Sequence, residues 1–282
     1  LTSSQIGALA TAVIKELSSA QIQALGSSGV TALSTAQIQA LDTNDVTNLT
    51  FTQVGALTTA QLSTLTASQI VGLETADMGA LSGTQIKALN TSAINALSSN
   101  QIKTLSSTQL QALTSPQIQA LGTSGINQLT TAQISTLSSS NIGALSSAQI
   151  VNLDPTLFGK LTVAQIGSIS TTALSGLSSD ALQALGTTGA SALTAAQVNA
   201  LGASNITSLS TTQLSVLSTS AVNALSSAQI SALGTSKINS LTSTQLRALS
   251  NIAVNTLSSA QITQLDTAKI SSLSASQISA LA

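Results

Sequence analysis

The sequence predicts an all-α fold, a solenoid or superhelical array of very short helices, and three observations lead to this prediction. Every eighth position from Leu1 to Leu281 is leucine, with Ile169 as the only departure. A Ser/Thr-x-x-Gln motif, which marks the start of a helix, recurs in the same frame. The charged residues follow the order that a helix dipole favours. An unbroken short period indicates one small unit stacked on itself many times.

The eight positions of the repeat, here called slots one to eight from the leucine onward, each have a role in a short helix. Typical octads are LSSAQIQA at 17–24 and LSSAQISA at 225–232. Slot two is mostly Ser, Thr, Gly, Asp or Asn, the residues preferred as N-caps. Slot five, commonly Gln, closes a capping box with slot two, and apolar residues in slots one and six form a hydrophobic staple. Each octad of this kind therefore predicts a helix of about six residues that begins after slot two.

The period of eight excludes longer helices. Eight residues turn about 800° around a helix axis, so a leucine stripe would rotate by about 80° per octad. A coiled coil needs a seven-residue spacing. Isolated helices below about 12 residues are marginal in water, so slots one and six must be buried against neighbouring octads.

The charged residues and prolines support this frame independently. Seven of the eight acidic residues occupy slots two, four or five, and five of the seven basic residues occupy slots seven or eight. Lys237 and Lys269, in slot five, are exceptions. Pro116 and Pro155 fall in the first turn of the predicted helices, where a missing N–H costs little.

A second period of sixteen residues divides the octads into two classes. From Gln5 onward, 17 of 18 residues at this spacing are Gln, and the exception is Ala181. We therefore predict 8-residue segments paired into a 16-residue repeat. The interleaved segments are single turns, 3₁₀ pieces or helices, since copies such as LGSSGVTA (25–32) and LGTSGINQ (121–128) hold two glycines. The alternative architecture is a β-solenoid with 16-residue coils, which Thr, Ile and Val favour and the capping boxes disfavour.

The domain organisation follows from the unbroken register. Residues 1–282 predict one continuous repeat array, which we expect to be a segment of a longer protein. No run of 18 apolar residues occurs, so no transmembrane helix is expected.

The composition excludes most chemistry. Only 5% of residues are charged, against about 25% in ordinary soluble proteins. The chain contains neither Cys nor His, which removes thiol chemistry and the usual zinc ligands. Seven basic residues form no basic stripe for nucleic acid. We therefore expect no enzyme, no catalytic, cofactor-binding or metal residues, no cofactor and no nucleic-acid partner.

The remaining candidates have structural interpretations. Asp42 with Asp45, and Glu74 with Asp77, are the nearest to paired carboxylates, and we interpret each pair as a cap and a first-turn acid. Phe51 in slot three is expected on the surface, and Phe158 in slot six is expected in the core.

The motif Leu-Ser/Thr-x-x-Gln-Ile-x-Ala-Leu, seen at 17–25 and 225–233, resembles octapeptide-repeat regions of giant bacterial secreted or surface proteins. These proteins are often described as adhesion-related exoproteins, and the resemblance covers the whole chain. It implies an extracellular or cell-surface array without catalysis, acting as a stalk or a filament-forming, adhesive segment. We expect end-to-end or lateral self-association into fibres and contact with cell surfaces or glycans. The alternative is a binding module whose Ser/Thr/Asn/Gln surface holds a glycan, an abiotic surface or ice.

Overall fold

The computed structural model describes residues 1–281, and none of these residues lies in a β-strand. The predicted all-α array of very short helices is confirmed, and the alternative β-solenoid is wrong. The chain divides into two compact units, Leu1–Ala144 and a second that begins at Leu145.

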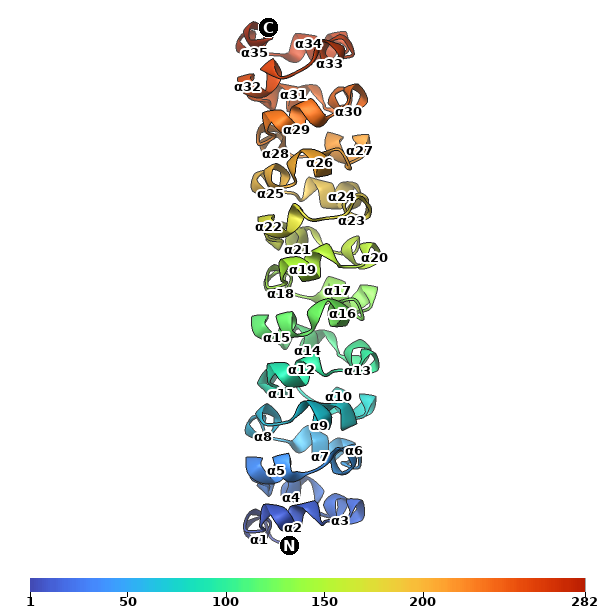
Figure 1. The fold of residues 1–282 in the computed structure, drawn as a ribbon, viewed down its shortest axis with the longest axis vertical. Coiled ribbons are helices and arrows are strands. Elements are labelled where there is room, and N and C mark those ends of the chain that lie inside the picture. The colour runs from blue at the N-terminus through green and yellow to red at the C-terminus, as the bar shows by residue number, and fades with distance from the viewer. Residues whose placement is uncertain (282) are drawn as a thin grey trace. The chain divides into compact units, whose positions relative to one another are not determined.

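The first unit contains eighteen helices of five to seven residues (Figure 1), which are α1 (Ser3–Gly7), α2 (Thr11–Lys15), α3 (Ser19–Ala24), α4 (Gly26–Ala32), α5 (Thr35–Ala40), α6 (Thr43–Thr47), α7 (Phe51–Ala56), α8 (Thr59–Ser63), α9 (Ala67–Gly72), α10 (Thr75–Ala80), α11 (Gly83–Ala88), α12 (Thr91–Asn95), α13 (Ser99–Thr104), α14 (Ser107–Ala112), α15 (Ser115–Ala120), α16 (Gly122–Ile126), α17 (Thr131–Thr136) and α18 (Ser139–Gly143).

The described part of the second unit contains seventeen helices of four to six residues, which are α19 (Ser147–Val151), α20 (Pro155–Phe158), α21 (Val163–Ser168), α22 (Thr171–Leu174), α23 (Ser179–Ala184), α24 (Gly186–Ser191), α25 (Ala195–Ala200), α26 (Gly202–Ile206), α27 (Thr211–Ser215), α28 (Thr219–Asn223), α29 (Ser227–Ala232), α30 (Thr235–Ser240), α31 (Ser243–Ala248), α32 (Asn251–Asn255), α33 (Ser259–Thr263), α34 (Thr267–Ser272) and α35 (Ala275–Ala280).

The capping box begins the Gln-class helices as predicted, and α5 illustrates its geometry. Ser34 in slot two is extended, with φ −68° and ψ 162°. Its hydroxyl accepts the Gln37 N–H at 3.2 Å, and the Gln37 side-chain oxygen accepts the Ser34 N–H at 2.7 Å. The helix ends where Leu41, the next slot one, returns to extended backbone at ψ 134°. One octad thus contains both the start signal and the stop of its helix.

The glycine-rich octads are also helices, so the question that the sequence left open is settled. Helix α4 begins without a side-chain cap, because Leu25 stays helical at ψ −27° and the chain turns at Gly26, where φ is +63°. A left-handed φ of this kind favours glycine. The second glycine has a steric reason, since a Cβ on Gly29 would lie 2.8 Å from the Leu25 Cβ.

Helices stack in turns of more than three and fewer than four octads. Within each unit a helix packs mainly against the helix three places further along, as α4 packs on α7 and α28 on α31. Side chains also bond to backbone four octads earlier, for example from Gln37 to Ile6. The sixteen-residue period is therefore an alternation along the chain rather than the turn of the superhelix. Successive turns lie one above another within each unit (Figure 1).

Slots one and six form the core, as predicted. Leu33 and Ile38, from the same octad, are 4% and 1% exposed. Phe158 is fully buried, whereas Phe51 is 55% exposed. Both phenylalanines lie where the slot assignment places them.

Candidate functional site

Hydrogen bonds from slot-five side chains connect the turns, and we call these bonds the inner ladder. In α13 the Gln101 Nε2 donates to the carbonyl of Ile70 and to that of Leu73, both at 2.8 Å. These acceptors lie 31 and 28 residues earlier. The same pattern recurs in both units, with donors that include Gln37, Gln53, Gln61, Gln69, Gln85, Gln109, Gln117, Gln133, Gln197, Gln213, Gln229, Gln245, Gln261 and Gln277. Gln101 is only 2% exposed, so these bonds form inside the protein.

Slot-five residues other than glutamine also donate in this ladder. Asn141 donates through Nδ2 to the Leu113 carbonyl at 3.0 Å. Lys237 and Lys269, which did not fit the predicted charge order, direct their ammonium groups at the carbonyls of Thr207 and Asn239. Each replaces the glutamine amide by a charged donor. A lysine in slot five can therefore supply the N–H donor of the inner ladder, which explains why these two lysines occupy an early helical position.

A second set of bonds, here called the outer ladder, joins exposed slot-seven side chains to slot-eight carbonyls three octads later. Gln111 donates to the Thr136 carbonyl at 2.9 Å, and Asn199 donates to the Ala224 carbonyl at 2.9 Å. Thr47 bonds to the Gly72 carbonyl at 2.9 Å. The outer ladder therefore bonds in the direction opposite to the inner one.

Together the two ladders satisfy the carbonyls at the helix ends. The last four carbonyls of a helix lack partners within it, and in a six-residue helix they are most of its acceptors. At the end of α9, Ile70 and Leu73 accept from Gln101, and Gly72 accepts from Thr47. Among residues 1–281 no buried side-chain polar atom lacks a partner. Neighbouring turns thus supply the caps that each short helix cannot supply itself.

The two residues of each acid pair lie next to each other, and both pairs act in capping a helix. The Asp45 N–H donates to Asp42 at 2.8 Å, and the Asp42 N–H donates to Asp45 at 3.0 Å. Asp77 accepts the Glu74 N–H at 3.0 Å. Burial, followed by the neighbouring Asp42 charge, raises the pKa of Asp45, and burial with the Glu74 charge raises the pKa of Asp77. Each pair thus forms the capping box of its own helix.

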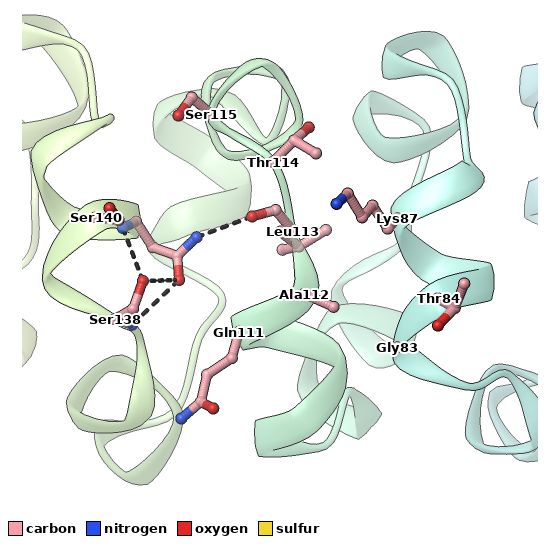
Figure 2. Close-up of a pocket in the computed structure, with 11 residues that line it drawn as sticks. Gly83, Thr84, Lys87, Gln111, Ala112, Leu113, Thr114, Ser115, Ser138 and Ser140 are labelled. Carbon is pink, nitrogen blue, oxygen red and sulfur yellow. Dashed lines mark hydrogen bonds between the residues drawn. The ribbon is translucent and has the colours of Figure 1, made fainter.

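The surface of the first unit carries a shallow groove (Figure 2) with a volume of about 480 Å³. Its walls come from α11, α14, the start of α15 and α18, and they carry hydroxyl and amide groups with Lys87 as the one charged residue. Asn141 anchors one wall through the Leu113 carbonyl, and the Ser138 hydroxyl donates to Asn141 at 2.6 Å. The groove is open, and four of its polar side chains take part in the ladders and caps, namely Gln111, Thr114, Ser138 and Asn141.

The described residues contain no assembled metal site, since nowhere in 1–281 do three or more His, Cys, Asp or Glu side chains gather. No helix over the same residues has the length and hydropathy needed to cross a membrane.

The second role of slot five is the feature that sequence reasoning missed. A signal for it was present, because a capping box accepts Glu as readily as Gln, yet no octad carries Glu in slot five. The preference for Gln, with Asp45 and Asp77 as the only acids in slot five, indicates that the N–H₂ half of the side chain is used as well as the oxygen.

Stacked short helices joined by two hydrogen-bond ladders define a helical repeat protein. A model of the ALTTAQ repeat matches residues 1–35, 30–59, 70–107, 96–123 and 204–235. These segments cover more than half of the 282 residues, and the chain therefore belongs to the ALTTAQ repeat family. A search of curated proteins found no match.

Proposed function

We propose that this chain is a structural repeat segment, a stalk or filament-forming array of an extracellular or cell-surface protein, without catalytic activity. The observation that carries the proposal is the pair of ladders, whose bonds recur along each unit. Because each added turn caps the one before it, length can grow by adding octads without any new type of contact. Such an arrangement suits a segment that spans a distance or assembles with other copies.

The setting in a bacterial secreted or adhesion-related protein is part of the same proposal. It is supported by the resemblance of the octad motif to the repeat regions of such proteins, and by a surface of hydroxyl and amide groups with few charges. With charged residues at 5%, repulsion between copies is weak. Lateral or end-to-end association into fibres is the expected partner interaction.

Sedimentation velocity of the chain at increasing concentration tests the proposal. We expect assemblies that grow with concentration and respond little to salt, because Debye screening acts only on charges. A chain that stays monomeric at every concentration would contradict the filament-forming function. Assemblies that dissolve at high salt would indicate charge-driven contacts instead.

A binding module is the second candidate, and recurring hydroxyl pairs favour it. The slot-two and slot-four hydroxyls of one octad lie about 3 Å apart at Thr50 and Thr52 (3.1 Å) and at Ser210 and Thr212 (2.9 Å). The pairs Ser218 with Ser220 and Ser274 with Ser276 are similar, each at 3.0 Å. Exposed hydroxyl pairs can bond to sugars, mineral surfaces or ice. A glycan array and an ice-recrystallisation assay, with bovine serum albumin as control, would distinguish this function from a passive stalk.

A further inference from the structure

Two positions in slot five carry an acid, where Gln, Asn and Lys side chains in other octads donate an N–H to the inner ladder. Asp45 in α6 and Asp77 in α10 occupy slot five, and each is 5% exposed. A carboxylate has two acceptor oxygens and no donor. At these two positions the ladder therefore depends on the protonation of the carboxyl group.

The slot-five asparagines indicate the direction of the second oxygen of each acid, because Asn and Asp side chains have the same length, and Asn141 is one example. Its Oδ1 accepts the N-cap N–H of Ser138 at 3.1 Å, and its Nδ2 donates to the carbonyl 28 residues earlier at 3.0 Å. Asp45 and Asp77 use one oxygen in the same way, accepting their N-cap N–H groups at 3.0 Å. Asn205, also in slot five, donates to the carbonyls 31 and 30 residues earlier at 3.3 Å and 3.0 Å. By the same register, the second oxygen of Asp45 is directed toward the carbonyls of residues 14–17, and that of Asp77 toward those of residues 46–49.

We propose that Asp45 and Asp77 are proton-operated latches between turns of the first unit. When neutral, each carboxyl donates its O–H to a carbonyl 28 to 31 residues earlier and completes the inner ladder. When ionised, each carboxylate has no donor for that carbonyl and that connection is open. Acidification thus tightens the first unit at two defined positions.

The charged groups around Asp45 are few. Helix α6 packs against α3 and α9, and neither of these helices holds a charged residue. Asp42 precedes α6 on the same octad, and Lys15 and Glu16 lie at the end of α2, beside Leu17. The nearby Asp42 charge and the burial of the group both favour the neutral form of Asp45.

The surroundings of Asp77 are similar. Helix α10 packs against α7 and α13, of which only α13 carries a charge, Lys103. Glu74 is the N-cap of α10, and Asp45 belongs to α6, whose end leads to Leu49. Burial and the Glu74 carboxylate again favour protonation.

The direction of the pH effect follows from linkage. Both pKa values are raised in the folded chain, above the value of about 3.9 expected for an unfolded Asp. The folded state therefore binds more protons, and its added stability is fully present below the unfolded pKa. That stability is lost as pH rises through the raised, folded-state pKa.

Hydrogen exchange of the full chain at pH 7 and near pH 4, corrected for intrinsic rates, tests the latch. We expect protection in 9–24 and 41–48 to rise about two- to tenfold on acidification, the gain of one hydrogen bond. In Asp45→Asn, a permanent donor replaces the proton, so protection should be high at both pH values. Asp77→Asn should do the same for its own segment. Asp180→Asn, an exposed slot-four variant, should leave both segments as in the wild type.

Two results would overturn the proposal. One is Asp45→Asn protection at pH 7 that equals or falls below that of the unchanged chain. The other is a rise in protection at pH 7 on addition of sodium or calcium chloride that equals the rise expected from acid, together with no gain on acidification at low salt. A cation rather than a proton would then fill the gap.

Discussion

At the scale of single residues, slot-five glutamine is the residue on which the array depends. Its Oε1 accepts the N-cap N–H of its own helix, and its Nε2 donates to the preceding turn. In α13 both functions meet in Gln101, which accepts from Ser98 at 2.8 Å and donates to two carbonyls. Glutamate would preserve the first function and eliminate the second.

We therefore expect Gln101→Glu to destabilise the chain by about 2–4 kcal/mol, because two buried carbonyls lose their donor and face an acceptor. The control is Gln111→Glu, which adds the same charge on the exposed outer ladder and should cost under about 1 kcal/mol. Urea unfolding followed by circular dichroism measures both. Equal costs would mean that the inner ladder contributes nothing beyond the outer one.

The capping half of slot five was predictable from sequence, but the ladder half was not. Ser18 and Gln21 are three residues apart, so the capping box is a local pattern. The partners of Gln101 lie 28 and 31 residues away, and a perfect octad repeat carries no information on which octad stacks on which. For the same reason the sequence could not show why Lys237 and Lys269 depart from the charge pattern, since their acceptors lie in the preceding turn.

At the scale of elements, burial of slots one and six stabilises helices that are too short to form alone. Leu137 is 3% exposed, whereas Ser139 in slot three of the same octad is partly exposed. Leu137→Ala should cost about 2–5 kcal/mol, and Ser139→Ala should change stability by under about 0.5 kcal/mol. Thermal unfolding of the two variants compares them, and similar midpoints would refute the inward and outward assignment of the slots.

The helix-to-helix turns at glycine give a second test at this scale. Gly122 has φ +63°, while Gly79 lies inside α10, and a Cβ at either position meets no atom within 4 Å. The two sites therefore differ in backbone conformation rather than in space. Gly122→Ala should destabilise by about 1–2 kcal/mol, whereas Gly79→Ala should stabilise by about 0.5–1 kcal/mol. A stabilising effect at both sites, measured by urea unfolding, would show that the left-handed turn is not required.

At the element scale, the conformation of these turns could not be predicted from the sequence. Two glycines in LGTSGINQ lower helix propensity, and from sequence that could mean a turn or a helix. In the structure Leu121 stays helical at ψ −23°, so the chain changes direction at Gly122. That backbone state depends on the packing of the neighbouring turns and is not encoded in the octad alone.

At the scale of the whole molecule, the acids divide unevenly between the two units. The buried Asp45 and Asp77, with raised pKa values, lie in the first unit. Asp154 and Asp266, exposed N-caps whose pKa values are lowered, lie in the second. Bonding to Thr156 lowers the pKa of Asp154, and the Lys269 N–H, which donates at 2.9 Å, lowers that of Asp266.

The two units should therefore respond to acid with opposite signs. A lowered folded-state pKa gives stability that is present above the unfolded value of about 3.9 and is lost as pH falls through the folded value. A raised one gives stability that appears as pH falls toward about 3.9. On titration from pH 7 downward, hydrogen-exchange protection should first rise around α6 and α10, and then fall around α20 and α34. The variants Asp154→Asn and Asp266→Asn should remove the later loss without affecting the earlier gain. If hydrogen-exchange protection fell in both units as pH falls, the buried acids would be ionised at every pH at which the chain remains folded.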